Sequence, residues 1–106
     1  MDITFIKKKI RNQEYDLSIH AHNERQEEQI AIEEIEKVLS KGDIIEKYPN
    51  DQRGESCLVA GTVYKKPLHI VCGIRNDRLL IVTVYRPKQP AWIGYKTRVK
   101  ELKSRE

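Results

Sequence analysis

Two apolar runs decide the fold: LHIVCGI at Leu68–Ile74 and LLIVTVYR at Leu79–Arg86. Both are dense in β-branched and other apolar residues, which fit a pleated, buried surface. The break between them is polar, and its central residues, Asn76 and Asp77, tolerate positive φ angles. We therefore predict a β-hairpin closed by a two-residue loop.

The polar residues of this hairpin are candidates for chemistry. If the ladder continues unbroken from the predicted loop, His69 and Arg86 lie at the same end of one face. A one-residue slip would instead put His69 beside Thr83 and Tyr85. We favour the unbroken register, which predicts His69 and Arg86 as a pair that binds and transforms a phosphate.

Three helical segments precede the strands, at residues 2–11, 19–29 and 31–39. Ser18 is a good N-cap for the second, and Gly42 follows the third, where glycine supplies a left-handed cap. The third segment is amphipathic, so we expect its apolar side to cover the sheet. The residues expected to meet in that layer are Ile32, Ile35, Val38 and Leu39 from the helix and Ile70, Cys72 and Ile81 from the sheet.

Two further strands are predicted at residues 44–48 and 56–63, whereas residues 15–17 are expected to be a link. With the hairpin this makes four consecutive strands joined by short turns, which favours an antiparallel meander. The predicted fold class is α+β, with N-terminal helices packed on a four-stranded antiparallel sheet.

The length of 106 residues fits one domain, 1–106, with a core at about 15–92 and a basic tail at 93–106. No apolar run approaches the roughly 20 residues of a membrane span, and the start of the chain lacks a signal-peptide pattern. Cys57 and Cys72 fall inside predicted strands, where buried thiols suit a reducing compartment. We therefore expect a cytoplasmic protein without a membrane association.

The net charge of +4 is uneven, because residues 1–87 contain 14 basic and 14 acidic side chains and cancel. Residues 88–106 contain six basic and two acidic side chains and carry the whole excess. Such a tail could follow an RNA backbone and stack a base, or it could simply aid solubility, and the two interpretations are about equal. The RNA-binding candidates within residues 88–106 are Trp92, Lys96, Arg98 and Lys100.

The second helical segment places His20 and Glu24 four residues apart, on one helical face. His22 lies about 200° round the helix from His20, so the two cannot share one metal ion. A zinc site would also need further ligands at motif spacing, and the cysteines do not supply them. We therefore expect no metal and no cofactor, and a lone His–Glu pair is more often a surface contact.

The histidine at position 69 is the sharper signal, because its apolar neighbours predict that it is at least half buried. The alternative interpretation is a core-edge histidine satisfied by the backbone, which is the commoner case for a single histidine. By the same standard Arg86 is usually a surface cation, and Thr83 and Tyr85 are ordinary strand residues. The catalytic interpretation gains weight only because these groups fall near one end of one hairpin.

Five short segments and one tryptophan resemble a small prokaryotic domain family of unknown function. They are Leu17–Ala21, Ile45–Pro49, Cys57–Gly61, Pro67–Val71 and Thr83–Pro87, followed by Trp92. That family is placed by similarity in the barnase–EndoU–colicin–RelE group of ribonuclease toxins. The resemblance implies a RelE-like or barnase-like α+β fold and metal-independent RNA cleavage. It also implies an antitoxin partner, often a small zinc-finger protein.

Residue by residue, the resemblance puts the family's histidines at His20 and His69 and its last-strand polar residues at Thr83 and Tyr85. Many members have an arginine four residues after the helix histidine. Here that position is Glu24, and Arg25 stands one step further on, turned by about 100°. We keep Arg25 as an RNA-binding candidate.

The sequence thus predicts a toxin-like endoribonuclease in which the ribose 2′-hydroxyl attacks the adjacent phosphate. In this scheme His69 is the acid or base and His20 its counterpart, Arg86 binds the phosphate, and Tyr85 or Thr83 donates a hydrogen bond. The alternative is a non-catalytic module that binds protein or nucleic acid through the same surface. The enzyme requires the His20 helix, His69 and Arg86 to surround one concavity.

Overall fold

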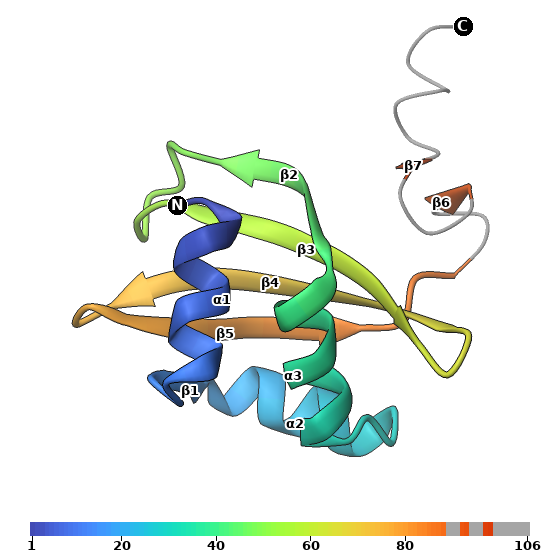
Figure 1. Ribbon diagram of the computed structural model, residues 1–106. Helices are drawn as coiled ribbons and strands as arrows, with labels where there is room; N and C mark the ends of the chain where they lie inside the picture. The colour runs from blue at the N-terminus through green and yellow to red at the C-terminus, as the bar shows by residue number, and fades with distance from the viewer. Residues whose placement is uncertain (89–91, 94–96, 99–106) are drawn as a thin grey trace, which may run out of the picture.

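The computed structural model describes residues 1–88, 92–93 and 97–98, and it confirms the three helical segments (Figure 1). They are α1 (Ile3–Arg11), α2 (Ile19–Glu27) and α3 (Ile32–Lys41). Side chains cap the first two, because Asp2 accepts a hydrogen bond from the Phe5 amide and Ser18 from the Ala21 amide.

The main sheet has five strands, so the prediction of four antiparallel strands is wrong. In chain order they are β1 (Tyr15–Leu17), β2 (Asp43–Tyr48), β3 (Ser56–Val63), β4 (Lys66–Arg75) and β5 (Arg78–Tyr85). Their order across the sheet is β1-β5-β4-β3-β2, with β1 parallel to β5 and the other pairs antiparallel. The short strands β6 (Trp92–Ile93) and β7 (Thr97–Arg98) pair with each other in a separate sheet.

Strand β1 is too short to give a readable sequence period, and long-range contacts hold it in place. Arg78 Nε lies 2.9 Å from Asp16 Oδ2, and this hydrogen bond holds the pKa of Asp16 below its usual range. The Tyr15 hydroxyl donates to Glu36 on α3 at 2.6 Å. These contacts fix the edge of the sheet from which α2 departs.

The bond from Tyr15 to Glu36 predicts an alkaline stability loss. Burial, and then the hydrogen bond and charge of Glu36, raise the pKa of Tyr15 from 10.0 to about 12. Below pH 10 the Tyr15 hydroxyl is neutral in both the folded and unfolded chains, so its hydrogen bond contributes fully to the free energy of unfolding. Between about pH 10 and 12 the unfolded chain loses the proton first, and the contribution disappears. In urea titrations Tyr15→Phe should therefore be less stable than wild type by about 0.5–1.5 kcal/mol at pH 8. The gap should close towards pH 12, and a gap independent of pH would contradict the assignment.

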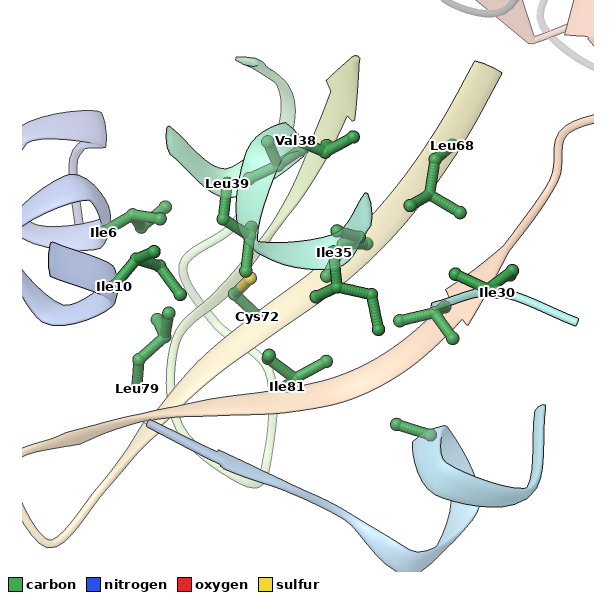
Figure 2. Packing of buried hydrophobic residues seen from close by; sticks show 14 of the residues in the cluster. Ile6, Ile10, Ile30, Ile35, Val38, Leu39, Leu68, Cys72, Leu79 and Ile81 are labelled. Carbon is green, nitrogen blue, oxygen red and sulfur yellow. The ribbon is translucent and has the colours of Figure 1, made fainter. Parts of the chain in front are cut away.

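The predicted layer between α3 and the sheet is confirmed. Helices α1 and α3 lie on one face of the sheet, and α2 lies along the β5 edge beyond the end of β1 (Figure 1). The buried cluster combines Ile35, Val38 and Leu39 of α3 with Ile70, Cys72 and Ile81, while Ile32 is partly buried against it. Figure 2 shows the α3 side chains packed over Cys72 and Ile81. Both cysteines are free and buried, as predicted, and burial raises the pKa of the Cys57 thiol to about 11.

Gly42 ends α3, but not in the predicted left-handed conformation, because its φ is −77°. Space explains the glycine instead. A Cβ atom there would lie 2.6 Å from the carbonyl oxygens of both Val38 and Ala60. Gly42 therefore lets the chain turn from α3 into β2 close against β3.

The hairpin loop is as predicted, since Asn76 and Asp77 have φ angles of 55° and 60°. The predicted register holds only as far as Cys72, which faces Ile81. A bulge then follows, and Val71 faces Thr83. The extra residue, Val82, inverts the faces of the remainder of β5 relative to the unbroken ladder.

Candidate functional site

The face of the sheet opposite α1 and α3 carries the polar residues that the sequence singled out. Because neighbours alternate along a strand, the burial of Leu68 and Ile70 against the helices turns His69 to the other face. The ladder places His69 between Ala60 on β3 and Tyr85 on β5. The bulge therefore produces the pairing of His69 with Tyr85 that the slipped register would give.

The side chains of His69 and Tyr85 form a direct pair. His69 Nδ1 lies 3.1 Å from the Tyr85 hydroxyl oxygen, and the rings meet edge to face with centroids 5.2 Å apart. His69 is 0% exposed, whereas Tyr85 is partly exposed. Tyr85 is thus the member of the pair that can meet a ligand, and His69 stands behind it.

Glu24 on α2 links a second histidine to the same strand. Its Oε1 accepts hydrogen bonds from the Thr83 hydroxyl at 2.5 Å and from the Val84 amide at 3.1 Å. Its Oε2 lies 3.2 Å from His20 Nε2. Helix α2 therefore closes the edge of β5 beyond β1 and holds an imidazole there that is 70% exposed.

These two groups of contacts meet on β5. Thr83 and Tyr85 are two residues apart and point to the same face, about 7 Å apart along the strand. Four of the five predicted catalytic residues, His20, His69, Thr83 and Tyr85, therefore lie along one end of β5. They come from three elements, α2, β4 and β5.

A family model described as a domain of unknown function (DUF4258) matches residues 17–86, more than half of the chain. The chain belongs to this family. The matched segment contains both the His69–Tyr85 pair and the His20–Glu24–Thr83 contacts. No curated protein and no solved structure matches the chain.

Arg86, the last residue of the DUF4258 match, does not join the site. Its Nη2 lies 2.7 Å from Glu34 Oε2 on α3, and its Nη1 donates to the Pro67 carbonyl at 3.2 Å. The prediction that Arg86 and His69 share a face is therefore wrong. The bulge before Thr83 explains the error, because it turns Arg86 to the helix side.

Of the RNA-binding candidates in this DUF4258 chain, Arg25 is the one whose side chain the structure describes, and it is not brought to the site. Arg25 Nη1 donates to the Ile30 carbonyl at 3.2 Å, so this arginine ties α2 to the start of α3. The other four candidates lie outside the residues whose side chains the structure describes: Trp92, Lys96, Arg98 and Lys100.

The sequence did not reveal the central role of Glu24 in this DUF4258 site. The four-residue spacing from His20 signalled the helical pair. Its contacts with Thr83 and Val84 join positions about sixty residues apart, and no local pattern reveals them.

Two general properties of the described part of the DUF4258 chain bear on its chemistry. Within residues 1–88, no three side chains of the metal-binding types His, Cys, Asp and Glu gather where they could hold an ion. The helices in the same range are all too short or too polar to cross a membrane.

Proposed function

We propose that this DUF4258 domain is a toxin-like endoribonuclease that cleaves RNA without a metal ion. The observation that carries the proposal is the hydrogen-bonded His69–Tyr85 pair, set beside His20, Glu24 and Thr83 on the sheet face opposite α1 and α3. Two histidines at one strand end can provide the proton acceptor and the proton donor that such a reaction needs.

The His69–Tyr85 pair acts as the base. The Tyr85 hydroxyl takes the proton of the ribose 2′-hydroxyl while it passes its own proton to Nδ1 of His69. The freed 2′-oxygen attacks phosphorus, and the bond from phosphorus to the 5′-oxygen breaks.

His20 is the acid. The carboxylate of Glu24, 3.2 Å from its Nε2, fixes the orientation of the ring. Nδ1 of His20 then gives a proton to the departing 5′-oxygen, which leaves a 2′,3′-cyclic phosphate and a 5′-hydroxyl. Thr83 positions Glu24, and Arg86 takes no part because Glu34 holds it.

The proposal includes an antitoxin partner, because a cell that makes a ribonuclease must restrain it. The resemblance to the RelE-containing toxin group supports both the activity and the partner, and it suggests a small zinc-finger protein. The face that carries Tyr85 is the surface that such a partner would need to cover.

The second candidate is a non-catalytic protein-binding module. Two observations favour it: His69 is completely buried, and Ile19, next to His20, is 82% exposed. An exposed isoleucine at the start of α2 would suit a protein partner better than RNA.

The product of RNA cleavage tests the proposal. We expect purified protein in excess chelator to cut end-labelled RNA and leave a 2′,3′-cyclic phosphate. An oligonucleotide with a single 2′-deoxyribose at the cut position should resist, since it lacks the attacking group. If neither free nor ribosome-bound RNA is cut, the enzyme proposal fails and the binding module replaces it.

A further inference from the structure

A groove with two lysines lies on the side of the sheet that carries α3, opposite the candidate site. Its volume is about 380 Å³, and it runs between the C-terminal half of α3 and the ends of β2 and β3. Lys37 and Lys41 form one wall, and Tyr64 closes the end. Ala60 also lines it, but Val38 packs against the neighbouring Gly61, so the groove lies on the α3 side of β3. His69, which pairs with Ala60 in the ladder, faces the other side.

The two lysines of this groove outnumber its one carboxylate, Asp43. They are four residues apart on α3, so they project from one side of the helix. Among residues 1–88, no carboxylate lies within ion-pair distance of either ammonium group. An adjoining hollow of about 370 Å³ shares Lys41 and adds Lys7 and Lys47. Two carboxylates, Asp2 and Asp43, also line that hollow, which leaves a positive balance.

Tyr64 gives the groove an aromatic surface. It is 76% exposed, in a two-residue turn where both Tyr64 and Lys65 have positive φ angles. The ammonium of Lys37 lies 4.9 Å from the ring centroid and 3.2 Å from the hydroxyl. These two contacts with Lys37 hold the Tyr64 ring in place, although it lies in an exposed turn.

We propose that this groove binds single-stranded nucleic acid, with Lys37 and Lys41 on the phosphates and a base stacked on Tyr64. Lysines that follow a backbone beside an exposed aromatic ring are the usual elements of such sites. The choice of RNA as the natural ligand rests on the proposed function, because an enzyme that cuts RNA would use a second surface to hold the strand away from the cleaved bond. An acidic protein would match the lysines but would leave Tyr64 without a role.

Binding of a fluorescent single-stranded DNA 12-mer, followed by anisotropy, tests the groove apart from catalysis, because DNA lacks the 2′-hydroxyl. The double variant Lys37→Glu/Lys41→Glu should bind at least tenfold more weakly. Its slope of log affinity against log salt should be flatter by about 1.4, since each lost contact to a single strand removes about 0.7. Tyr64→Ala should weaken binding roughly 5- to 150-fold, the usual effect of one lost stacking interaction.

The matched control is Lys8→Glu/Arg75→Glu, which changes the net charge equally at two exposed positions outside the groove. It should bind like wild type, and circular dichroism should show all variants folded. Equal weakening by both double variants would overturn the inference, as would an unchanged affinity of Tyr64→Ala. Competition by polyglutamate as effective as that by unlabelled DNA would assign the groove to acidic polypeptides instead. A wild type that binds DNA through the groove but cuts no RNA would uphold this inference while the proposed enzyme fails.

Discussion

Replacing His69 by glutamine is expected to lower RNA cleavage by about 10²–10⁴-fold, the usual contribution of a general acid or base. Glutamine can keep a hydrogen bond to the Tyr85 hydroxyl, but it cannot accept a proton from it near neutral pH. The measurement is the rate of cleavage of a labelled RNA, with circular dichroism to show that the variant is folded. In bacteria the same change should abolish toxicity on induced expression.

Two companion variants make this experiment specific. Tyr85→Phe removes only the hydroxyl that connects His69 to the substrate, so it should lower cleavage by a similar factor. His22→Gln is the matched control, because His22 is exposed on α2 and turned about 200° from His20. It should cleave RNA like wild type. A folded His69→Gln protein with the wild-type rate would remove His69 from the mechanism and leave it as a structural histidine.

The elements with strong local patterns were predictable from the sequence. The amphipathic face of α3 predicted its layer with Ile70 and Ile81, because the apolar residues of that helix recur on one side of it. The Asn76–Asp77 loop was equally clear, since few residues tolerate two successive positive φ angles. Both features are encoded within a few neighbouring residues.

Strand β1 and the bulge at Val82 were not predictable, because neighbouring residues do not encode them. β1 exists through its parallel pairing with β5 and the bond from Arg78 to Asp16, both between distant segments. The sequence of β5 gives no sign of the bulge, because Val82 and Val84 are both typical strand residues. Because of this one extra residue, Tyr85 lies on the same face as His69, where the unbroken register placed Arg86.

The candidate site shows the same division. His20, His69, Thr83 and Tyr85 were found because polar residues interrupt otherwise regular segments. Their arrangement depends on Glu24, which bonds the edge of β5 where β1 ends. A carboxylate on a polar helix carries no sequence signal of such a role, since most glutamates there face solvent.

The substitution Leu39→Ala is expected to lower the free energy of unfolding by about 2–5 kcal/mol, the cost of deleting a buried leucine side chain. Leu39 is 0% exposed and lies in the layer between α3 and the sheet (Figure 2). Water therefore cannot reach the cavity that the substitution would leave. Because a small domain has a total stability of about 5–15 kcal/mol, the loss should be visible as a lower urea midpoint with an unchanged slope.

Two neighbouring substitutions define what that loss means. Leu39→Met keeps the volume of the side chain and should cost less than about 1.5 kcal/mol. Ser40→Ala, at the exposed position that follows, should stay within about 0.5 kcal/mol of wild type. RNA cleavage by Leu39→Ala should fall only in proportion to the unfolded fraction, because Leu39 packs on the face opposite Tyr85. A folded Leu39→Ala protein of wild-type stability would show that α3 does not supply the main cover of the sheet.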